Sequence, residues 1–191
     1  MPVQNEKGKV IVIVAPSGSG KTTIANMLLD EFDRIRFSTS ATTREPRQGE
    51  KDGREYYFMG EQEFRETAEE EGFLEWEYYN GNRYGTLQSE VDKLVESGYF
   101  PLLDIEVKGA LNVKKMYGPD CVSIFIRPPS LEELKRRLVG RSSESEETLE
   151  SRLKIAEKEL TYADRFDYVV VNDDLQQAYN RVKEIVARFI N

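Results

Sequence analysis

A glycine-rich segment near the N-terminus, APSGSGKTT at residues 15–23, has the composition and spacing of a phosphate-binding loop. It follows the β-branched run from Val10 to Val14 and precedes a helical pattern, which is the strand, loop and helix context that this motif requires. Glycines in such a loop let backbone N–H groups turn toward an anion, and the helix N-terminus adds partial positive charge. The segment therefore predicts that the chain binds a nucleoside triphosphate.

Two side chains of this loop are expected to bind different parts of the triphosphate complex. Lys21 is expected to reach the β- and γ-phosphates, and the hydroxyl of Thr22 is expected to ligate Mg²⁺. Ala15 stands where the motif has glycine, which leaves the geometry of the loop entry open. A chance glycine-rich turn is the alternative interpretation, but the Lys-Thr pair and the flanking strand and helix all favour a phosphate site. The residues predicted to bind the triphosphate are Ser17, Gly18, Ser19, Gly20, Lys21, Thr22 and Thr23.

A second cationic segment runs from Ser40 to Arg47, with Arg44 and Arg47 three residues apart and Pro46 between them. Two converging guanidinium groups with a nearby tyrosine can hold a monophosphate through paired hydrogen bonds. Taken alone, however, the segment could equally be a solvated surface turn.

Five further blocks resemble the guanylate kinase family over nearly the whole chain, from Lys9 to Asn191. In order they read FSTSATTREPRQGEKDGREYYF, FLEWEYYNGNRYGT, LLDIEVKGA, PPSLEELKRRLVGR and VVVNDD. The resemblance implies direct in-line transfer of a phosphoryl group from ATP to GMP and dGMP, with ADP as co-product and Mg²⁺ as cofactor. Guanylate-kinase-like modules that have lost catalysis and bind phosphorylated peptides are the alternative, and the intact phosphate loop favours the enzyme.

The resemblance also assigns an acceptor site. Glu75 is placed against guanine, whose N1–H and 2-amino groups one carboxylate can accept together; adenine lacks this pair, so discrimination of about 10⁴ is expected. Read without the family, Glu75 would be an exposed strand residue. The substrate-binding set implied by the resemblance is Ser40, Arg44, Arg47, Tyr56, Glu75, Tyr84, Thr86, Asp104 and Glu106, with the phosphate held by the arginines and tyrosines.

Catalysis of this kind needs no general base, because a phosphate monoester with a second pKa near 6 already carries a reactive oxyanion at neutral pH. The requirement is instead for cations that bring two polyanions together. The residues assigned to this role are Lys21, Arg44, Arg137, Arg141 and Arg152, the last three flanking a predicted flap at Gly140; surface arginines of amphipathic helices are the alternative for these three.

Two residues that end predicted strands complete the candidate site. Asp104 occupies the place where a carboxylate orients Mg²⁺ in phosphate-loop proteins, so Thr22 and Asp104 form the predicted metal site; a strand-end cap or a partner for Lys21 is the alternative. Asn172 resembles the family residue near adenine, although asparagine at a strand end is often only a turn former.

Composition limits what else the chain can do. Its 191 residues contain no histidine, which excludes histidine-based triads and imidazole bases, and its single cysteine, Cys121, sits in an apolar run where burial is expected. A net charge of −8 argues against nucleic acid and anionic membranes as partners. We expect a cytoplasmic protein that acts on the small molecules GMP and ATP, as a monomer or a homodimer.

The elements that must position these residues follow from the apolar pattern. Four unalternating runs, at 10–14, 100–103, 122–126 and 168–171, read as buried strands, and helical patterns lie between and after them. This alternation predicts one α/β domain over 1–191 with a parallel sheet flanked by helices. The resemblance makes it a P-loop NTPase fold with core 9–36, 88–135 and 165–191, a small mixed α/β GMP-binding insertion at 37–87 and a helical lid at 136–164.

Overall fold

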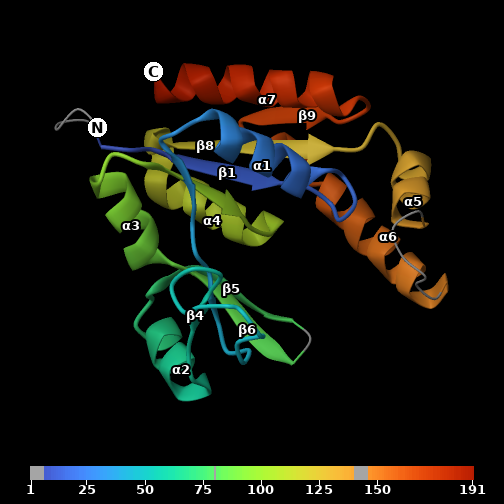
Figure 1. Cartoon of the computed structure of the whole chain (residues 1–191). Coiled ribbons are helices and arrows are strands. Elements are labelled where there is room, and N and C mark those ends of the chain that lie inside the picture. The colour runs from blue at the N-terminus through green and yellow to red at the C-terminus, as the bar shows by residue number, and fades with distance from the viewer. Residues whose placement is uncertain (1–6, 80, 140–145) are drawn as a thin grey trace.

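The computed structural model describes residues 7–79, 81–139 and 146–191, and of 146–148 it describes the backbone alone (Figure 1). A five-stranded parallel sheet has the order β2-β7-β1-β8-β9. Its strands are β1 (Val10–Val14), β2 (Ile35–Phe37), β7 (Phe100–Asp104), β8 (Cys121–Arg127) and β9 (Tyr168–Val171). The predicted parallel sheet is therefore confirmed.

The two edge strands of this sheet differ from the expectation. The strand β2 was not revealed by the apolar pattern, because two of its three residues are exposed. The strand β9 forms where the run at 168–171 predicted it, but the prediction that it is buried is wrong for all of its residues except Val170. Its position at the sheet edge leaves the other three side chains partly open to solvent.

Helices cover both faces of this sheet, which explains why the central strands show no polar alternation. On one face α1 (Lys21–Glu31) and α7 (Leu175–Ile190) pack on Ile11 and Ile13, and on the other α3 (Gln88–Glu96) and α4 (Val107–Tyr117) pack on Val10 and Val12. Figure 1 shows α1 and α7 on one side of the strands and α4 on the other. Because alternate strand residues point to opposite faces, β1 contributes to both halves of the core and is almost fully buried.

A second, smaller sheet hangs below the core in Figure 1. Its order is β4-β3-β6-β5, from β3 (Ala41–Thr42), β4 (Tyr57–Phe58), β5 (Phe73–Tyr79) and β6 (Asn82–Leu87). The pairing of β3 with β4 is parallel and the other two pairings are antiparallel, so this sheet is mixed. With α2 (Glu61–Glu69) it encloses its own apolar cluster around Phe64 and Phe73, whose stacked rings lie 4.3 Å apart.

Two further helices lie beside the core, to the right in Figure 1. These are α5 (Leu131–Val139) and α6 (Glu146–Leu160), which share a small cluster of Leu134, Leu138 and Ala156. Ser130 caps α5, because the backbone N–H of Glu133 donates to Ser130 Oγ at 3.1 Å. The predicted flap at Gly140 and its Arg141 lie outside the described residues.

Short 3₁₀ turns, Gly118–Asp120 and Ala163–Arg165, lead into β8 and β9 respectively.

The carboxyl ends of all five parallel strands lie at one edge of the sheet, and an open α/β sheet binds its ligands at that edge. None of the helices in the described part of the chain is long and apolar enough to cross a membrane.

Candidate active site

The turn between β1 and α1 has the backbone of an anion-binding loop. Gly18 and Gly20 adopt φ values of 87° and 90°, which side-chain-bearing L-residues rarely tolerate. Only Glu71 has a positive φ among the described non-glycine residues, so Ala15 needs no left-handed conformation. Ala15 instead packs into the α1 and α7 side of the core with 7% of its surface exposed. Alanine at this motif position is therefore accommodated without backbone strain.

The loop is held from two sides at its two left-handed glycines. A Cβ at Gly20 would lie 2.4 Å from Asn172 Nδ2, and that amide donates to the carbonyl oxygen of Ser19 at 2.8 Å. A Cβ at Gly18 would lie 2.9 Å from a methyl carbon of Leu138 on α5. Side chains at either glycine would therefore collide with these neighbours. Asn172, predicted to lie near adenine, is buried behind the loop and braces its backbone.

A cavity of about 630 Å³ opens over this loop. Thr22 and Thr23 are exposed toward solvent in the first turn of α1, and Arg152 from α6 donates to Ser17 Oγ at 2.5 Å. The cavity is lined by residues 14–23 together with Tyr79, Asp104, Ile105, Glu106, Arg152, Ile155 and Glu159. The loop residues predicted from the motif thus lie together around one space, with one predicted lid arginine beside them.

Arg137, the other predicted lid arginine in the described part of the chain, points elsewhere. Its Nε donates to Glu133 Oε1 at 2.7 Å, and its Nη1 donates to the carbonyl oxygen of Asn172 at 2.9 Å. Arg137 is absent from the described lining of the loop cavity. In this arrangement its guanidinium ties α5 to the end of β9.

A second cavity, of about 400 Å³, lies between the core and the small sheet. Its lining contains Lys21, Ser40, Tyr56, Glu75, Glu77, Tyr79, Tyr84, Gly85, Asp104, Ile105 and Glu106. Most of the residues assigned to the acceptor site by resemblance are therefore gathered here, and Thr86 joins them through a hydrogen bond from its hydroxyl to Glu75 Oε1 at 2.7 Å. The two cavities share Lys21, Tyr79, Asp104, Ile105 and Glu106, so they adjoin.

Lys21 and Asp104 form an ion pair at this junction. The pair confirms that Asp104 is a partner for Lys21, as the alternative interpretation held. Asp104 and the exposed Thr22 also line the same loop cavity. Mg²⁺ is commonly held by one or two carboxylates together with substrate phosphates, so a hydroxyl and a carboxylate at the phosphate cavity fit such an ion. Within the described ranges, no three carboxylate, cysteine or histidine groups form a metal cluster of their own.

Carboxylates crowd the two cavities and raise each other's proton affinity. Burial raises the pKa of Glu75, and the neighbouring charge of Glu106 raises it further, while the hydrogen bond from Thr86 opposes the shift. Burial and the charges of Glu106 and Glu75 likewise raise the pKa of Glu77. On α6, burial and Glu106 raise the pKa of Glu159 to about 7. A ligand with paired N–H donors would relieve this crowding at Glu75.

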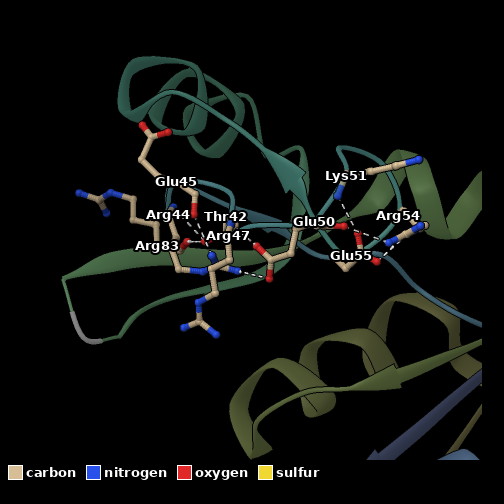
Figure 2. A network of polar contacts seen from close by, with 10 residues as sticks. Thr42, Arg44, Glu45, Arg47, Glu50, Lys51, Arg54, Glu55 and Arg83 are labelled. Atoms are coloured by element: carbon tan, nitrogen blue, oxygen red, sulfur yellow. Dashed lines mark hydrogen bonds and ion pairs between the residues drawn. The ribbon is translucent and has the colours of Figure 1, made fainter.

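The two predicted phosphate-clamp arginines are arranged around a carboxylate that the motif analysis did not single out (Figure 2). Arg44 Nη2 donates to Glu50 Oε1 at 2.9 Å, and the backbone N–H of Arg47 donates to Glu50 Oε2 at 2.7 Å. The Arg44 guanidinium also lies 5.4 Å from the ring centre of Tyr56. The Glu50 hydrogen bond, with a smaller contribution from Tyr84, raises the pKa of Arg44. The signal for Glu50 was its spacing of three residues after Arg47.

The guanylate kinase family model matches residues 7–189. The chain is 46% identical to a guanylate kinase of Chlorobaculum tepidum over 97% of its length and 95% of that protein's. It is 48% identical to a guanylate kinase of Chlorobium chlorochromatii, with 96% of each chain covered. A crystal structure of guanylate kinase from Anaplasma phagocytophilum, 34% identical, superposes with a TM-score of 0.72 over 97% of this chain and 87% of that one. The chain belongs to the guanylate kinase family.

Proposed function

We propose that the protein transfers the γ-phosphoryl group of ATP to GMP, and also to dGMP, giving ADP and GDP or dGDP. The observation that carries this proposal is the junction of the two cavities at Lys21 and Asp104. A triphosphate on the loop would direct its terminal phosphate toward Lys21, and an acceptor in the adjoining cavity would present its own phosphate to the same point. This juxtaposition is what in-line transfer requires.

Guanine is read, in this proposal, by the partly buried carboxylate of Glu75. Its Oε1 already accepts from Thr86, and the remaining lone pairs can accept from guanine N1–H and the 2-amino group. A base without that donor pair would leave a desolvated carboxylate unpaired, which is costly. The hydroxyls of Ser40 and Thr86 and the carboxylate of Glu106 complete the polar lining on that side.

The acceptor phosphate would be held by Arg44 and Arg47 together with Tyr56 and Tyr84. Tyr56 and Tyr84 line the acceptor cavity, and the Arg44 guanidinium lies against Tyr56. Because the acceptor is already an oxyanion at neutral pH, no residue has to remove a proton from it. This accounts for a phosphotransferase without histidine.

The donor side supplies most of the positive charge. Lys21, the loop N–H groups and Arg152 would surround the triphosphate, and Thr22 and Asp104 would hold Mg²⁺. When bound, Mg²⁺ neutralises the charge on the β- and γ-phosphate oxygens. Arg137 and Arg141 would join the site when the lid closes, which for Arg137 means exchanging its contact with Glu133 for a phosphate. We place this reaction in the cytoplasm.

A coupled assay of ADP release with ATP, Mg²⁺ and GMP tests this proposal. Turnover with GMP and dGMP, and far weaker turnover with AMP, CMP and UMP, is expected. Absence of turnover, accompanied by binding of a phosphorylated peptide to the acceptor cavity, would replace the enzyme by the interaction module.

A further inference from the structure

The first turn of α4 packs against the side chain of Glu75 at a glycine. A Cβ placed on Gly109 would lie 2.5 Å from Cγ, 2.7 Å from Cβ and 3.3 Å from Cδ of Glu75. Contacts of a Cβ below 3.0 Å are essentially never seen. Any residue other than glycine at position 109 must therefore displace Glu75 or move the helix.

Glycine at this position is not explained by the backbone. Gly109 lies inside α4 and does not have the positive φ that sets apart Gly18 and Gly20. Glycine in a helix is less favourable than alanine, because it loses more conformational entropy on folding. The benefit that offsets this cost is space, since the three heavy atoms nearest to its absent side chain all belong to Glu75.

Both elements on either side of this contact are anchored in the core. Val107, Ala110 and Val113 of α4 are buried against the central sheet. On β5, Leu74 is 4% exposed and belongs to the same apolar cluster. The Cβ of Glu75 is fixed by the β5 backbone and would lie 2.7 Å from the added methyl group, so rotation of the side chain cannot relieve this contact. An added methyl group must therefore shift Glu75 together with its strand relative to α4.

The opposite side of that side chain is also fixed. Glu75 faces Thr86 across the β5–β6 pair, and the Thr86 hydroxyl holds Oε1 at 2.7 Å. The carboxylate therefore lies between a helix that approaches at van der Waals distance and a strand that donates a hydrogen bond. Its position is set by the absence of a side chain at Gly109 as much as by Thr86.

We propose that Gly109 is a specificity-determining positioning residue for the acceptor base. It does not touch the substrate; it keeps Glu75 where both carboxylate oxygens can meet the N1–H and 2-amino groups of guanine. The inference rests on the proposed role of Glu75 in reading guanine. Because paired hydrogen bonds weaken steeply with distance and angle, a small displacement of Glu75 would be enough to lose discrimination.

The variant Gly109→Ala tests this proposal, and the readout is discrimination between two purine bases, not overall activity. The ratio of kcat/KM for GMP to that for IMP, which lacks the 2-amino group, should fall by about 10- to 100-fold, the size expected for charge-assisted hydrogen bonds. The KM for ATP should stay within about twofold of the wild-type value, because the loop cavity is not altered. Gly60→Ala is the matched control, because a Cβ on Gly60 would meet no heavy atom within 4 Å and its φ is −65°. Its substitution should leave the ratio unchanged.

A double-mutant cycle with Glu75→Ala separates positioning from a general packing defect. In the Glu75→Ala background Gly109→Ala has no carboxylate left to displace and should cause no further loss of discrimination, although its contact with the Cβ at position 75 remains. Additive losses in the double variant would overturn the proposal. Should Gly109→Ala fail to fold, Glu75→Asp serves instead, since it withdraws the carboxylate by one methylene with Gly109 intact. A wild-type GMP to IMP ratio in that variant would also overturn the proposal.

The failure of this inference can be told apart from failure of the proposed function. A wild-type enzyme that does not phosphorylate GMP contradicts the proposed function itself. A wild-type enzyme that does so, together with a Gly109→Ala variant of unchanged GMP to IMP ratio, contradicts only the role of Gly109.

Discussion

The ammonium group of Lys21 and the carboxylate of Asp104 meet where the phosphate-loop cavity joins the acceptor cavity. Lys21 begins α1 and Asp104 ends the neighbouring strand β7, so the pair is created by the parallel register of β1 and β7. Both side chains keep about a fifth of their surface exposed, 22% each, and remain accessible to an incoming phosphate. Lys21 therefore lines both cavities.

Replacing Lys21 by alanine should lower kcat by about 10²- to 10³-fold, the effect of removing one preorganised charge from a transferring group. The melting temperature should remain close to the wild-type value, because Lys21 is partly exposed and its ion pair with Asp104 lies at the edge of a cavity. Steady-state assays with saturating ATP and GMP provide the measurement. Lys115→Ala, an exposed lysine of α4, is the control and should behave as wild type. Near-normal turnover of the Lys21 variant would remove the phosphate-loop assignment.

Glu75→Gln should raise the KM for GMP by about 10- to 100-fold while the KM for ATP stays nearly constant. The physical reason is that an acceptor becomes in part a donor that faces the donors of guanine. Initial-rate measurements over a matrix of both nucleotides separate the two constants. Glu63→Gln on the exposed side of α2 is a suitable control. An unchanged KM for GMP would mean that the base is recognised by other groups.

Glu50→Gln should raise the KM for GMP by about 3- to 30-fold, because Arg44 loses its charged partner and the turn at Arg47 loses a strong acceptor. Isothermal titration with GMP would show the same weakening without any reaction. Glu45→Gln provides the matched control, since Glu45 is an exposed acid of the same turn. Tighter GMP binding in the Glu50 variant would show that Glu50 competes with the phosphate instead of preparing its site.

Stability should depend on pH through Glu159. Its pKa of about 7 in the folded protein exceeds the usual value of 4.5, so the folded state binds more protons than the unfolded state between these two values. Stability from this group is therefore fully present below about pH 4.5 and is lost as the pH rises through 7. Glu159→Gln should raise the melting temperature at pH 8 by about 2–4 °C, equivalent to ~1 kcal/mol in a chain of this size, and by less at pH 5.

Differential scanning calorimetry of the nucleotide-free protein at both pH values measures this effect. Glu157→Gln, on an exposed position of the same helix, controls for the loss of a charge from α6. An equal rise at pH 5 and pH 8 would show that the benefit of the Glu159 substitution is unrelated to its ionisation.

Contiguous features of the chain were enough to predict a large part of this molecule. The phosphate loop lies within nine consecutive residues, so its glycines, Lys21 and Thr22 act through local backbone geometry. The runs at β1, β7 and β8 predicted buried strands because burial on both faces leaves a direct trace in composition. The edge strands could not be predicted in this way. The strand β2 has no apolar run, and the apolar run of β9 did not indicate that three of its residues are exposed. Both strands take their places at the sheet edges by pairing with β7 and β8 respectively, and this pairing is not visible in local composition.

Contacts between distant segments were decided by the tertiary structure, although the sequence had offered Lys21 as one possible partner of Asp104. The pairing of Lys21 with Asp104, the bracing of Ser19 by Asn172 and the close approach of Gly109 to Glu75 each join residues more than 30 positions apart. Such contacts depend on strand order, helix position and the space that neighbouring side chains leave, and none of these is a property of a local segment. Residue types and spacing therefore predicted the chemistry available to the chain, while packing determined which groups meet to use it.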